Sequence, residues 1–286
     1  MKKNFLKSVV MAVVLTAAAG IFSACGDDGG FVEGREINVI SREDGSGTRG
    51  AFIDVMGIYV GGVDRTTVNA EIAPGTSHVL TNIAGDRYAI GYISLGSLND
   101  TVRAINVGGV AATEANVRNG SYPLFRTFYL AVSDGISPLA QDFLDFMVSA
   151  EGQEIVERNY IPALESPSPF TGGGHEGTIV VAGSTSVAPL MERMREAYIA
   201  LNPGVSIEIQ SVGSGGGINA ARDGMADIGM SSRDLREGEL VYLNAIAVAL
   251  DGLAVIVNND NTATNLSPDQ IHDIFVGEIT RWNELD

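Results

Sequence analysis

Residues 177–210 read GTIVVAGSTSVAPLMERMREAYIALNPGVSIEIQ, and this stretch decides the fold class. The apolar run at 178–182 predicts a buried strand, and the helix expected after it carries its apolar residues at 3.6-residue spacing. Asn202-Pro203-Gly204 ends that helix, and a second β-rich run at 205–209 follows at once. A strand, a helix and a strand joined so closely form the repeating unit of a parallel α/β sheet.

The same alternation of strands and helices continues on both sides of this unit. Residues 165–176 (ESPSPFTGGGHE) are crowded with Pro, Ser and Gly, which predicts a linker between two parts of the chain. The 286 residues are enough for two α/β lobes. Further strands are expected at 37–41, 88–93, 124–132, 226–230, 245–250 and 253–257, and further helices at 48–56, 77–84, 139–147, 152–158 and 268–275.

Four loops that follow expected strands share one composition. They are Gly45-Ser46-Gly47-Thr48, Gly183-Ser184-Thr185-Ser186, Gly213-Ser214-Gly215-Gly216 and Met230-Ser231-Ser232-Arg233. Free N–H groups at a helix start bind anions, glycine allows close backbone approach, and Ser or Thr adds a donor. Because ligands of α/β proteins bind beyond the carboxyl ends of the strands, four such loops together predict an anion site.

The first of these loops also matches a dinucleotide-binding pattern. Residues 45–50 fit G-x-G-x-x-G, and Asp64 lies at about the right distance to act as the ribose-binding acid. However, Gly61-Gly62 interrupts the strand expected before Asp64, and two acids, Glu43 and Asp44, stand where a pyrophosphate would sit. We therefore expect no nucleotide and no other cofactor.

Composition excludes several other classes of function. No serine lies in the G-x-S-x-G motif of hydrolases, His78, His175 and His272 are scattered, and Cys25 is the single cysteine. We therefore expect neither catalytic residues nor a metal site. The three lysines all lie within the first seven residues, and removing them from the net charge of −17 leaves −20. Such a charge argues against nucleic-acid binding, which needs basic patches.

The first 25 residues predict export. Three lysines, an apolar run from Val9 to Phe22 and Ser23-Ala24-Cys25 describe a signal peptide over residues 1–24. Residues 22–25 are similar to a bacterial lipobox, in which Cys25 would be lipidated and anchored to the cell membrane; an ordinary signal peptide is the alternative. Residues 25–35 would then be a tether.

Several segments together resemble one family. GTIVVAGSTSVAPL, GSGGGINAARDGMADIGMSSRDL and LSPDQIHDIFVGEITRWNEL resemble the first part of the PstS-like phosphate-binding lipoproteins of bacterial phosphate ABC transporters, and INVISREDGSGTRGAF, AIGYISLGSL, YPLFRTFYLAV and FLDFMVSAEGQEIVERNYIPAL resemble their second part. The order is rotated here, since residues 36–164 match the later part and residues 177–286 the earlier part. This arrangement has the form of a circular permutation.

The resemblance implies a two-lobed, type II-like periplasmic-binding-protein fold with a hinge. One lobe would comprise 36–117 and 259–286, the other 118–164 and 177–258, with linker 165–176 joining the family's usual termini. The expected function is capture of inorganic phosphate outside the cytoplasm and its delivery to a membrane permease, by a monomer that is not an enzyme. A fragment of a tandem gene and a domain-swapped pair are alternatives to a chain that closes its own cleft.

The resemblance also assigns site residues. One wall of the cleft would comprise Arg42, Ser46, Gly47 and Thr48, and the other Thr185, Ser186, Ser214 and Ser232. Around them, Asp44 would orient Arg42, and Gly215 and Arg233 would give support. Ser232 stands where some members carry an aspartate that accepts the proton of hydrogen phosphate, so sulfate, molybdate and tungstate remain alternative ligands. A surface or signalling protein with a degenerate cleft and an oxyanion hydrolase are the alternatives from other classes.

Overall fold

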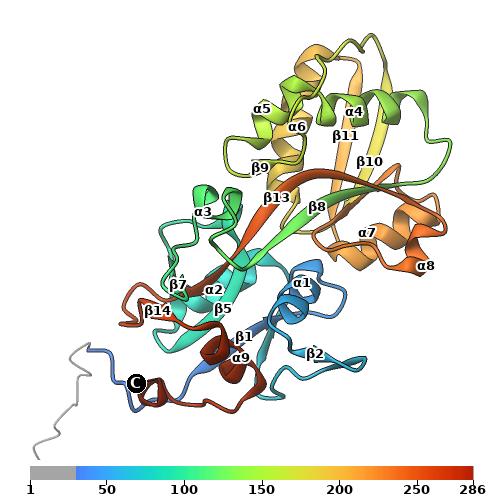
Figure 1. Cartoon of the computed structure of the whole chain (residues 1–286). Coiled ribbons are helices and arrows are strands. Elements are labelled where there is room, and N and C mark those ends of the chain that lie inside the picture. Colours follow the sequence, from blue (N-terminus) through green and yellow to red (C-terminus); the bar gives the residue numbers. More distant parts are fainter. Residues whose placement is uncertain (1–29, 286) are drawn as a thin grey trace, which may run out of the picture. The chain divides into compact units, whose positions relative to one another are not determined.

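One mixed sheet runs through residues 30–285, the part of the chain that the computed structural model describes (Figure 1). The predicted signal peptide 1–24 and the predicted lipidation site Cys25 lie outside these residues. The main path of the sheet, from one edge to the other, is β11 (Val205–Ser211), β10 (Gly177–Gly183), β12 (Ile228–Ser231), β8 (Phe125–Val132), β13 (Asn244–Val257), β5 (Ala89–Ser94), β1 (Asn38–Arg42) and β4 (Glu71–Ala73).

Short strands complete the β structure of the described residues. β6 (Arg103–Ala104) and β9 (Ile161–Pro162) pair with β13, while β7 (Asn106–Val107) pairs with β14 (Asn265–Leu266) and β2 (Tyr59–Val60) with β3 (Val63–Asp64). The helices are α1 (Gly47–Val55), α2 (Thr76–Gly85), α3 (Glu114–Arg118), α4 (Pro138–Val148), α5 (Ala150–Val156), α6 (Ala188–Leu201), α7 (Gly213–Arg222), α8 (Glu237–Leu240) and α9 (Pro268–Val276), with 3-10 turns η1 (Leu95–Ser97) and η2 (Trp282–Glu284). The α/β class expected from the sequence is confirmed.

The long strand β13 joins the two halves of the sheet. The apolar runs 245–250 and 253–257, expected as separate segments, form one strand because Asp251 and Gly252 continue the pairing between them. Up to Gly252 the strand pairs antiparallel with β8, and from Leu253 it pairs antiparallel with β5. In Figure 1, β13 crosses from the group of elements around α6 to the group around α2 and β5.

The hydrophobic side chains divide into clusters on either side of this crossing. We name residues 31–124 and 253–285 the α1 lobe, and residues 125–252 the α6 lobe. These limits differ by a few residues from those expected from the sequence, because Tyr122, Leu124 and Leu253 pack with the core that contains Phe52. The α6 lobe has a core of its own around β8, β10, α4 and α6.

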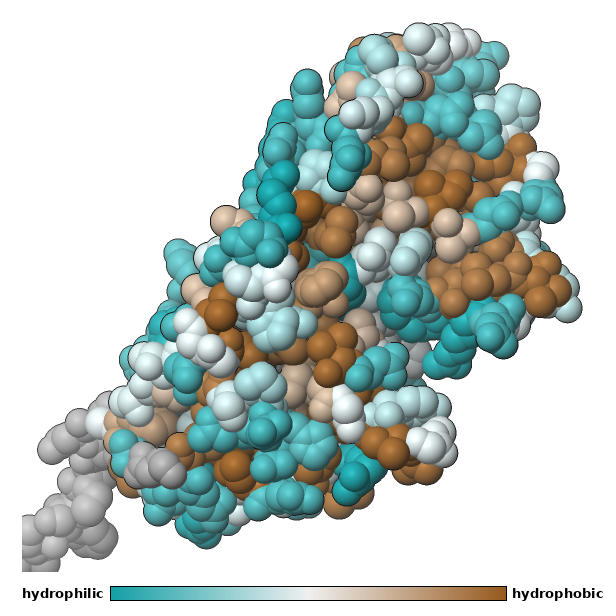
Figure 2. Space-filling model, viewed as in Figure 1, coloured by the Kyte–Doolittle hydropathy of each residue, from teal (hydrophilic) through white to brown (hydrophobic). Residues whose placement is uncertain are grey.

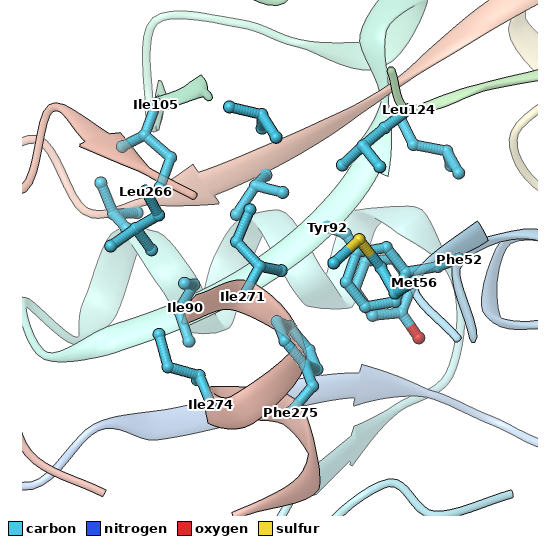
Figure 3. Close-up of a cluster of buried hydrophobic side chains, with 14 of the residues drawn as sticks. Phe52, Met56, Ile90, Tyr92, Ile105, Leu124, Leu266, Ile271, Ile274 and Phe275 are labelled. Carbon is cyan, nitrogen blue, oxygen red and sulfur yellow. The ribbon is translucent and has the colours of Figure 1, made fainter. Parts of the chain in front are cut away.

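The core of the α1 lobe brings together segments from opposite ends of the chain. In Figure 3, Ile271, Ile274 and Phe275 of α9 lie against side chains of β5 and α1. The ring of Phe52 stacks on that of Tyr92 at 3.9 Å between centroids, and Phe275 meets Phe52 edge-on at 4.7 Å. These buried aromatic pairs fix α1 over β5, so the loop that starts α1 has a rigid support.

Backbone hydrogen bonds also tie residues 33–37 to residues 280–283. The amide of Ile37 donates to the carbonyl of Thr280 (2.8 Å), and that of Asn283 donates to the carbonyl of Glu33 (2.8 Å). The segment 165–176, expected as a linker, contains no helix or strand and packs on the α6 lobe. There the amide of Phe170 donates to Glu151 (2.7 Å), and the amide of Gly174 donates to Asn202 (2.9 Å).

Apolar residues on the surface form separate patches. The face in Figure 2 shows brown areas divided by hydrophilic residues. Exposed apolar side chains of the described region include Val60, Val63, Val241 and Tyr242. Within residues 30–285, every helix is too short or too polar to cross a membrane.

Candidate anion-binding site

The loop after β1 has the geometry of an anion-binding helix start. β1 ends at Arg42, Gly45 turns the chain with a φ of 81°, and α1 begins at Gly47. Ser46 caps the helix, since its Oγ accepts a hydrogen bond from the amide of Arg49 (3.3 Å). The amides of Gly47 and Thr48 belong to the first turn, where N–H groups have no partner within the helix and the helix dipole is positive.

Three loops of the α6 lobe lie at one edge of the sheet. β11, β10 and β12 are neighbours and run parallel, so their carboxyl ends are adjacent. The turn that contains Thr185 and Ser186 follows β10, α7 begins at Gly213 after β11, and Ser232 follows β12. A Cβ on Gly183 would lie 2.2 Å from the carbonyl oxygen of Met230, so the close approach of these loops requires glycine there.

Hydrogen bonds join the loops of the two lobes. Thr48 Oγ1 and Ser186 Oγ are 2.8 Å apart, and Arg42 Nη2 donates to Thr185 Oγ1 at 3.0 Å. A third contact runs through the backbone, from the amide of Gly215 to the carbonyl of Gly45 (3.0 Å). The two walls predicted from the sequence therefore face each other in one place.

The remaining predicted residues complete the same cluster. A Cβ on Gly47 would lie 2.2 Å from Ser214 Oγ and 2.7 Å from Ser232 Oγ. Ser214 Oγ accepts from the amide of Ser232 (3.1 Å), and the two hydroxyl oxygens are 3.3 Å apart. We call Thr48, Thr185, Ser186, Ser214 and Ser232 the hydroxyl cluster. All of its members except Thr185 are at most 1% exposed.

Comparison with known proteins identifies the family. The family model described as PBP superfamily domain matches residues 16–151 and 168–286. The phosphate-binding protein PstS 2 of Streptococcus agalactiae is 41% identical over 293 residues, which cover 100% of this chain and 99% of that protein. The chain belongs to the PstS family. A crystal structure of a phosphate ABC transporter, phosphate-binding protein from Streptococcus pneumoniae TIGR4 shares 44% identity, with a TM-score of 0.70, and covers 88% of this chain and 100% of that one.

The share of each PstS relative that aligns with this chain indicates whether that relative has its segments in the same order. The S. agalactiae relative aligns from end to end, so it has the same order as this chain. The PstS protein of Bacillus subtilis is 33% identical over 112 residues, which cover 38% of this chain and 37% of that protein. A continuous alignment can follow only one half of a rotated sequence. The short match therefore fits the circular permutation, which stays a prediction.

The acid that pairs with Arg42 is not the one expected from the PstS resemblance. Arg42 is 2% exposed, and its Nε and Nη2 donate to the two carboxylate oxygens of Glu43 at 2.8 Å each. Asp44 was expected to orient Arg42, but its side chain is 98% exposed and pairs with Arg49 (2.8 Å). Glu43 rather than Asp44 pairs with Arg42, because Glu43 Oε2 also accepts a hydrogen bond from the amide of Gly75 (3.1 Å), which holds the carboxylate beside the guanidinium.

The charge of Glu43 is stabilised by this arrangement. Burial alone would raise the pKa of Glu43, but the hydrogen bonds and the positive charge of Arg42 outweigh it and lower the pKa below 4.5. Glu43 is therefore ionised at neutral pH, and it offsets the charge of the guanidinium.

The two other supporting residues expected from the sequence lie at the edge of the cluster. Gly215 makes the backbone bond to Gly45 described above. Arg233 points away from the hydroxyl cluster and forms two hydrogen bonds with Glu239, at 2.8 and 2.9 Å. Its Cδ would be 3.3 Å from a Cβ on Gly50, so it packs beside α1.

Four more polar residues lie next to the cluster, and the sequence indicated only one of them. Ser184 donates to Ser232 Oγ (2.9 Å), and Thr76 Oγ1 lies 3.2 Å from Thr185 Oγ1. A buried ion pair, Arg126 with Asp251, lies behind Ser232. Ser184 belongs to one of the four loops whose composition predicts an anion site, but nothing in the sequence alone marks the other three.

The site consists of buried, neutral hydrogen-bond donors and one cation, Arg42, whose charge is offset by Glu43. Hydroxyl groups both donate and accept hydrogen bonds, and amides at helix starts donate. Among residues 30–285, no group of three or more His, Cys, Asp or Glu side chains is placed to hold a metal ion. The arrangement is suited to hold a small oxyanion through donors from both lobes.

Proposed function

We propose that this protein captures inorganic phosphate between its two lobes and delivers it to the membrane permease of an ABC transporter. The observation that carries the proposal is the hydroxyl cluster, in which loops of both lobes meet beside Arg42 at the carboxyl ends of β1, β10 and β12. Membership of the PstS family, whose members are named phosphate-binding proteins, supports the same function.

Capture would work through closure of the lobes on the anion. Thr48 of the α1 lobe and Ser186 of the α6 lobe are within hydrogen-bond distance of each other, so an oxyanion bound beside this pair would receive donors from both. Arg42 adds charge-assisted hydrogen bonds, and the first turns of α1 and α7 add backbone amides. A ligand that touches both lobes stabilises the closed arrangement by its own binding free energy.

The protein would act as a carrier outside the cytoplasm rather than as an enzyme. The hydroxyl cluster and its surroundings offer hydroxyls, amides and the guanidinium of Arg42, whose carboxylate partner is engaged, and such groups bind an anion without supplying a general base. A signal peptide and a lipid on Cys25 would hold the protein at the outer face of the cell membrane. A monomer is sufficient, because residues of one chain form both walls.

A second candidate ligand is sulfate, and Ser232 is the residue that favours it. Hydrogen phosphate carries a proton that needs an acceptor, whereas sulfate only accepts. Ser232 and Ser214 can serve either anion because a hydroxyl donates and accepts. The nearest carboxylate to Arg42, that of Glu43, is already bound to the guanidinium. Discrimination between the two anions would then rest on hydroxyl orientation, which rejects sulfate less strongly than a carboxylate does.

Calorimetry on the mature protein tests the proposal. We expect binding heat with phosphate and weaker heat with sulfate, molybdate and tungstate. Absence of heat with all four anions would refute anion transport and favour a surface protein with a degenerate cleft. Tighter binding of sulfate than phosphate would establish the second candidate. Hydrolysis of a phosphate ester would show that the protein is an enzyme.

A further inference from the structure

A buried ion pair lies where β13 passes from one lobe to the other. Arg126 of β8 and Asp251 of β13 are directly opposite each other in the antiparallel register, and the next residue, Gly252, is the last that pairs with β8. Arg126 Nε and Nη2 donate to Asp251 Oδ2 at 3.1 and 2.9 Å. The side chains are 3% and 0% exposed. The pair is therefore dry and sits at the crossing strand.

Each partner also forms hydrogen bonds outside the pair, Arg126 within the α6 lobe and Asp251 to the α1 lobe. Arg126 Nη1 donates to the carbonyl oxygen of Ser232 at 3.4 Å, within the α6 lobe. Asp251 Oδ1 accepts from Ser94 Oγ at 2.8 Å and from the amide of Gly96 at 3.4 Å, both in the α1 lobe. A chain of hydrogen bonds thus runs from the α1 lobe through the ion pair to a member of the hydroxyl cluster.

A contribution to folding stability does not by itself explain why the Arg126–Asp251 pair is buried here. Burial raises the pKa of Asp251 and lowers that of Arg126, because each charged form loses water, although the partner's charge opposes both shifts. Buried ion pairs are often replaced by apolar residues of similar volume with little loss of stability, or even a gain. Arg126 lies over the ring of Phe128 at 5.1 Å, so apolar surroundings suitable for such a replacement exist.

The backbone of Ser232 is the part of the site that the pair contacts. Ser232 follows the last residue of β12, so the ladder of the sheet does not fix its carbonyl. Its amide donates to Ser214 Oγ, and its own Oγ accepts from Ser184. A shift of the Ser232 backbone would therefore disturb the hydrogen bonds of this residue to both Ser214 and Ser184.

We propose that Arg126 is a positioning residue for the anion site, which holds the Ser232 peptide in its binding orientation while Asp251 and Ser94 fix the guanidinium from the side of the α1 lobe. This inference rests on the proposed function, since it concerns the orientation of groups that would contact phosphate. Arg126 acts through Ser232 and needs no contact with the ligand.

The test is a double variant that removes the charges but keeps the volume, Arg126→Met with Asp251→Leu. We expect it to fold with an unfolding temperature close to that of the wild type. Its Kd for phosphate, measured by calorimetry, should rise at least tenfold. Arg126→Lys is the second variant. It keeps the charge next to Asp251, but an ammonium lacks the fork that spans Asp251 and the Ser232 carbonyl, so its Kd should also rise. A Kd within twofold of the wild type in both variants would overturn the proposal.

Two controls separate positioning from stability. Tyr198→Phe removes a buried hydrogen bond to Asp142 (2.6 Å) inside the α6 lobe, away from the site, and should leave the Kd unchanged even where it lowers the unfolding temperature. Ser232→Ala should reduce affinity much less in the double variant than in the wild type, because its hydroxyl is already misplaced there. Equal losses in both backgrounds would contradict the role of Arg126. If the wild type itself bound no anion, the proposed function would fail first, and that result is distinct from a variant that binds normally.

Discussion

Gly47→Ala is the sharpest single perturbation of the site. Gly47 is the first residue of α1, and a Cβ there would lie 2.2 Å from Ser214 Oγ, 2.7 Å from Ser232 Oγ and 2.9 Å from Ser214 Cβ. The first distance is about 1.2 Å short of the 3.4 Å at which ordinary van der Waals contact begins. Both serines are fully buried, so neither can move aside without disturbing the α6 lobe.

The expected effect is loss of closure rather than loss of fold. Alanine is a better helix former than glycine, so the stability of the α1 lobe should be unchanged or slightly higher. The added methyl group would hold the lobes apart by about 1 Å, which lengthens the Thr48–Ser186 and Arg42–Thr185 contacts beyond hydrogen-bond distance. One neutral and one charge-assisted hydrogen bond are together worth about 3 kcal/mol. This corresponds to a loss of affinity of about 100-fold.

Calorimetry with phosphate and small-angle scattering with and without phosphate would measure this effect. Gly50→Ala is the matched control, because it lies one turn further along α1 and a Cβ there would meet only the flexible side chain of Arg233, at 3.3 Å. We expect Gly50→Ala to bind phosphate as the wild type does and to contract on binding. Gly47→Ala should do neither. Phosphate affinity of Gly47→Ala within threefold of the control would refute the closed geometry described for the cluster.

Four further outcomes follow from the same contacts. Arg42→Ala should weaken phosphate binding at least tenfold in calorimetry, and an unchanged Kd would remove Arg42 from the site. Neutral donors at about 3 Å should dominate phosphate binding, because charges beyond about 8 Å are screened by salt. The Kd should therefore change less than about threefold between about 0.1 M and 1 M salt. A steep loss of affinity with salt would assign binding to the arginines. The pKa of Glu43 is lower in the folded protein than its ordinary value of 4.5, so its contribution to stability is full above that pH and is lost as the pH falls through the folded value. Denaturant unfolding of Glu43→Gln should therefore show a shallower decline below pH 4.5 than the wild type does, and equal declines would contradict the pairing with Arg42. Gly277→Ala, at a φ of 84° and with Thr67 Oγ1 2.9 Å from the new Cβ, should lower the free energy of unfolding by at least about 1 kcal/mol, while Gly85→Ala, which meets no atom within 4 Å, should not.

Loop composition was sufficient to predict which loops come together. Strand ends followed by Gly, Ser and Thr pointed to Gly47, Ser186, Ser214 and Ser232. The three serines come together because the parallel strands β10, β11 and β12 bring their carboxyl ends to one edge, and Gly47 packs against Ser214 and Ser232 from the other lobe. Periodicity likewise placed α6 and α9 to within one or two residues where helices were expected. These signals are local, so one sequence is enough to read them.

Features that depend on partners distant in the sequence could not be predicted in the same way. Arg126 and Asp251 are single charged residues inside apolar runs, and only the pairing of β8 with β13 shows that they face each other. The choice of Glu43 over Asp44 as the partner of Arg42 depends on the amide of Gly75, which a separate segment supplies. The division of β13 between two partners also needs the whole sheet, since both parts of the strand are equally apolar.

The arrangement of the lobes along the chain sets the order in which they can fold during synthesis. The α6 lobe is one uninterrupted segment, residues 125–252, so its core can form as soon as that segment is available. The α1 lobe must wait, because Phe52 and Tyr92 pack on Phe275, and Ile37, which precedes β1, needs the carbonyl of Thr280. Ile37 and Phe52 thus precede the α6 lobe in the sequence but reach their final packing after it. The hydroxyl cluster, which has members in both lobes, forms only at that final step.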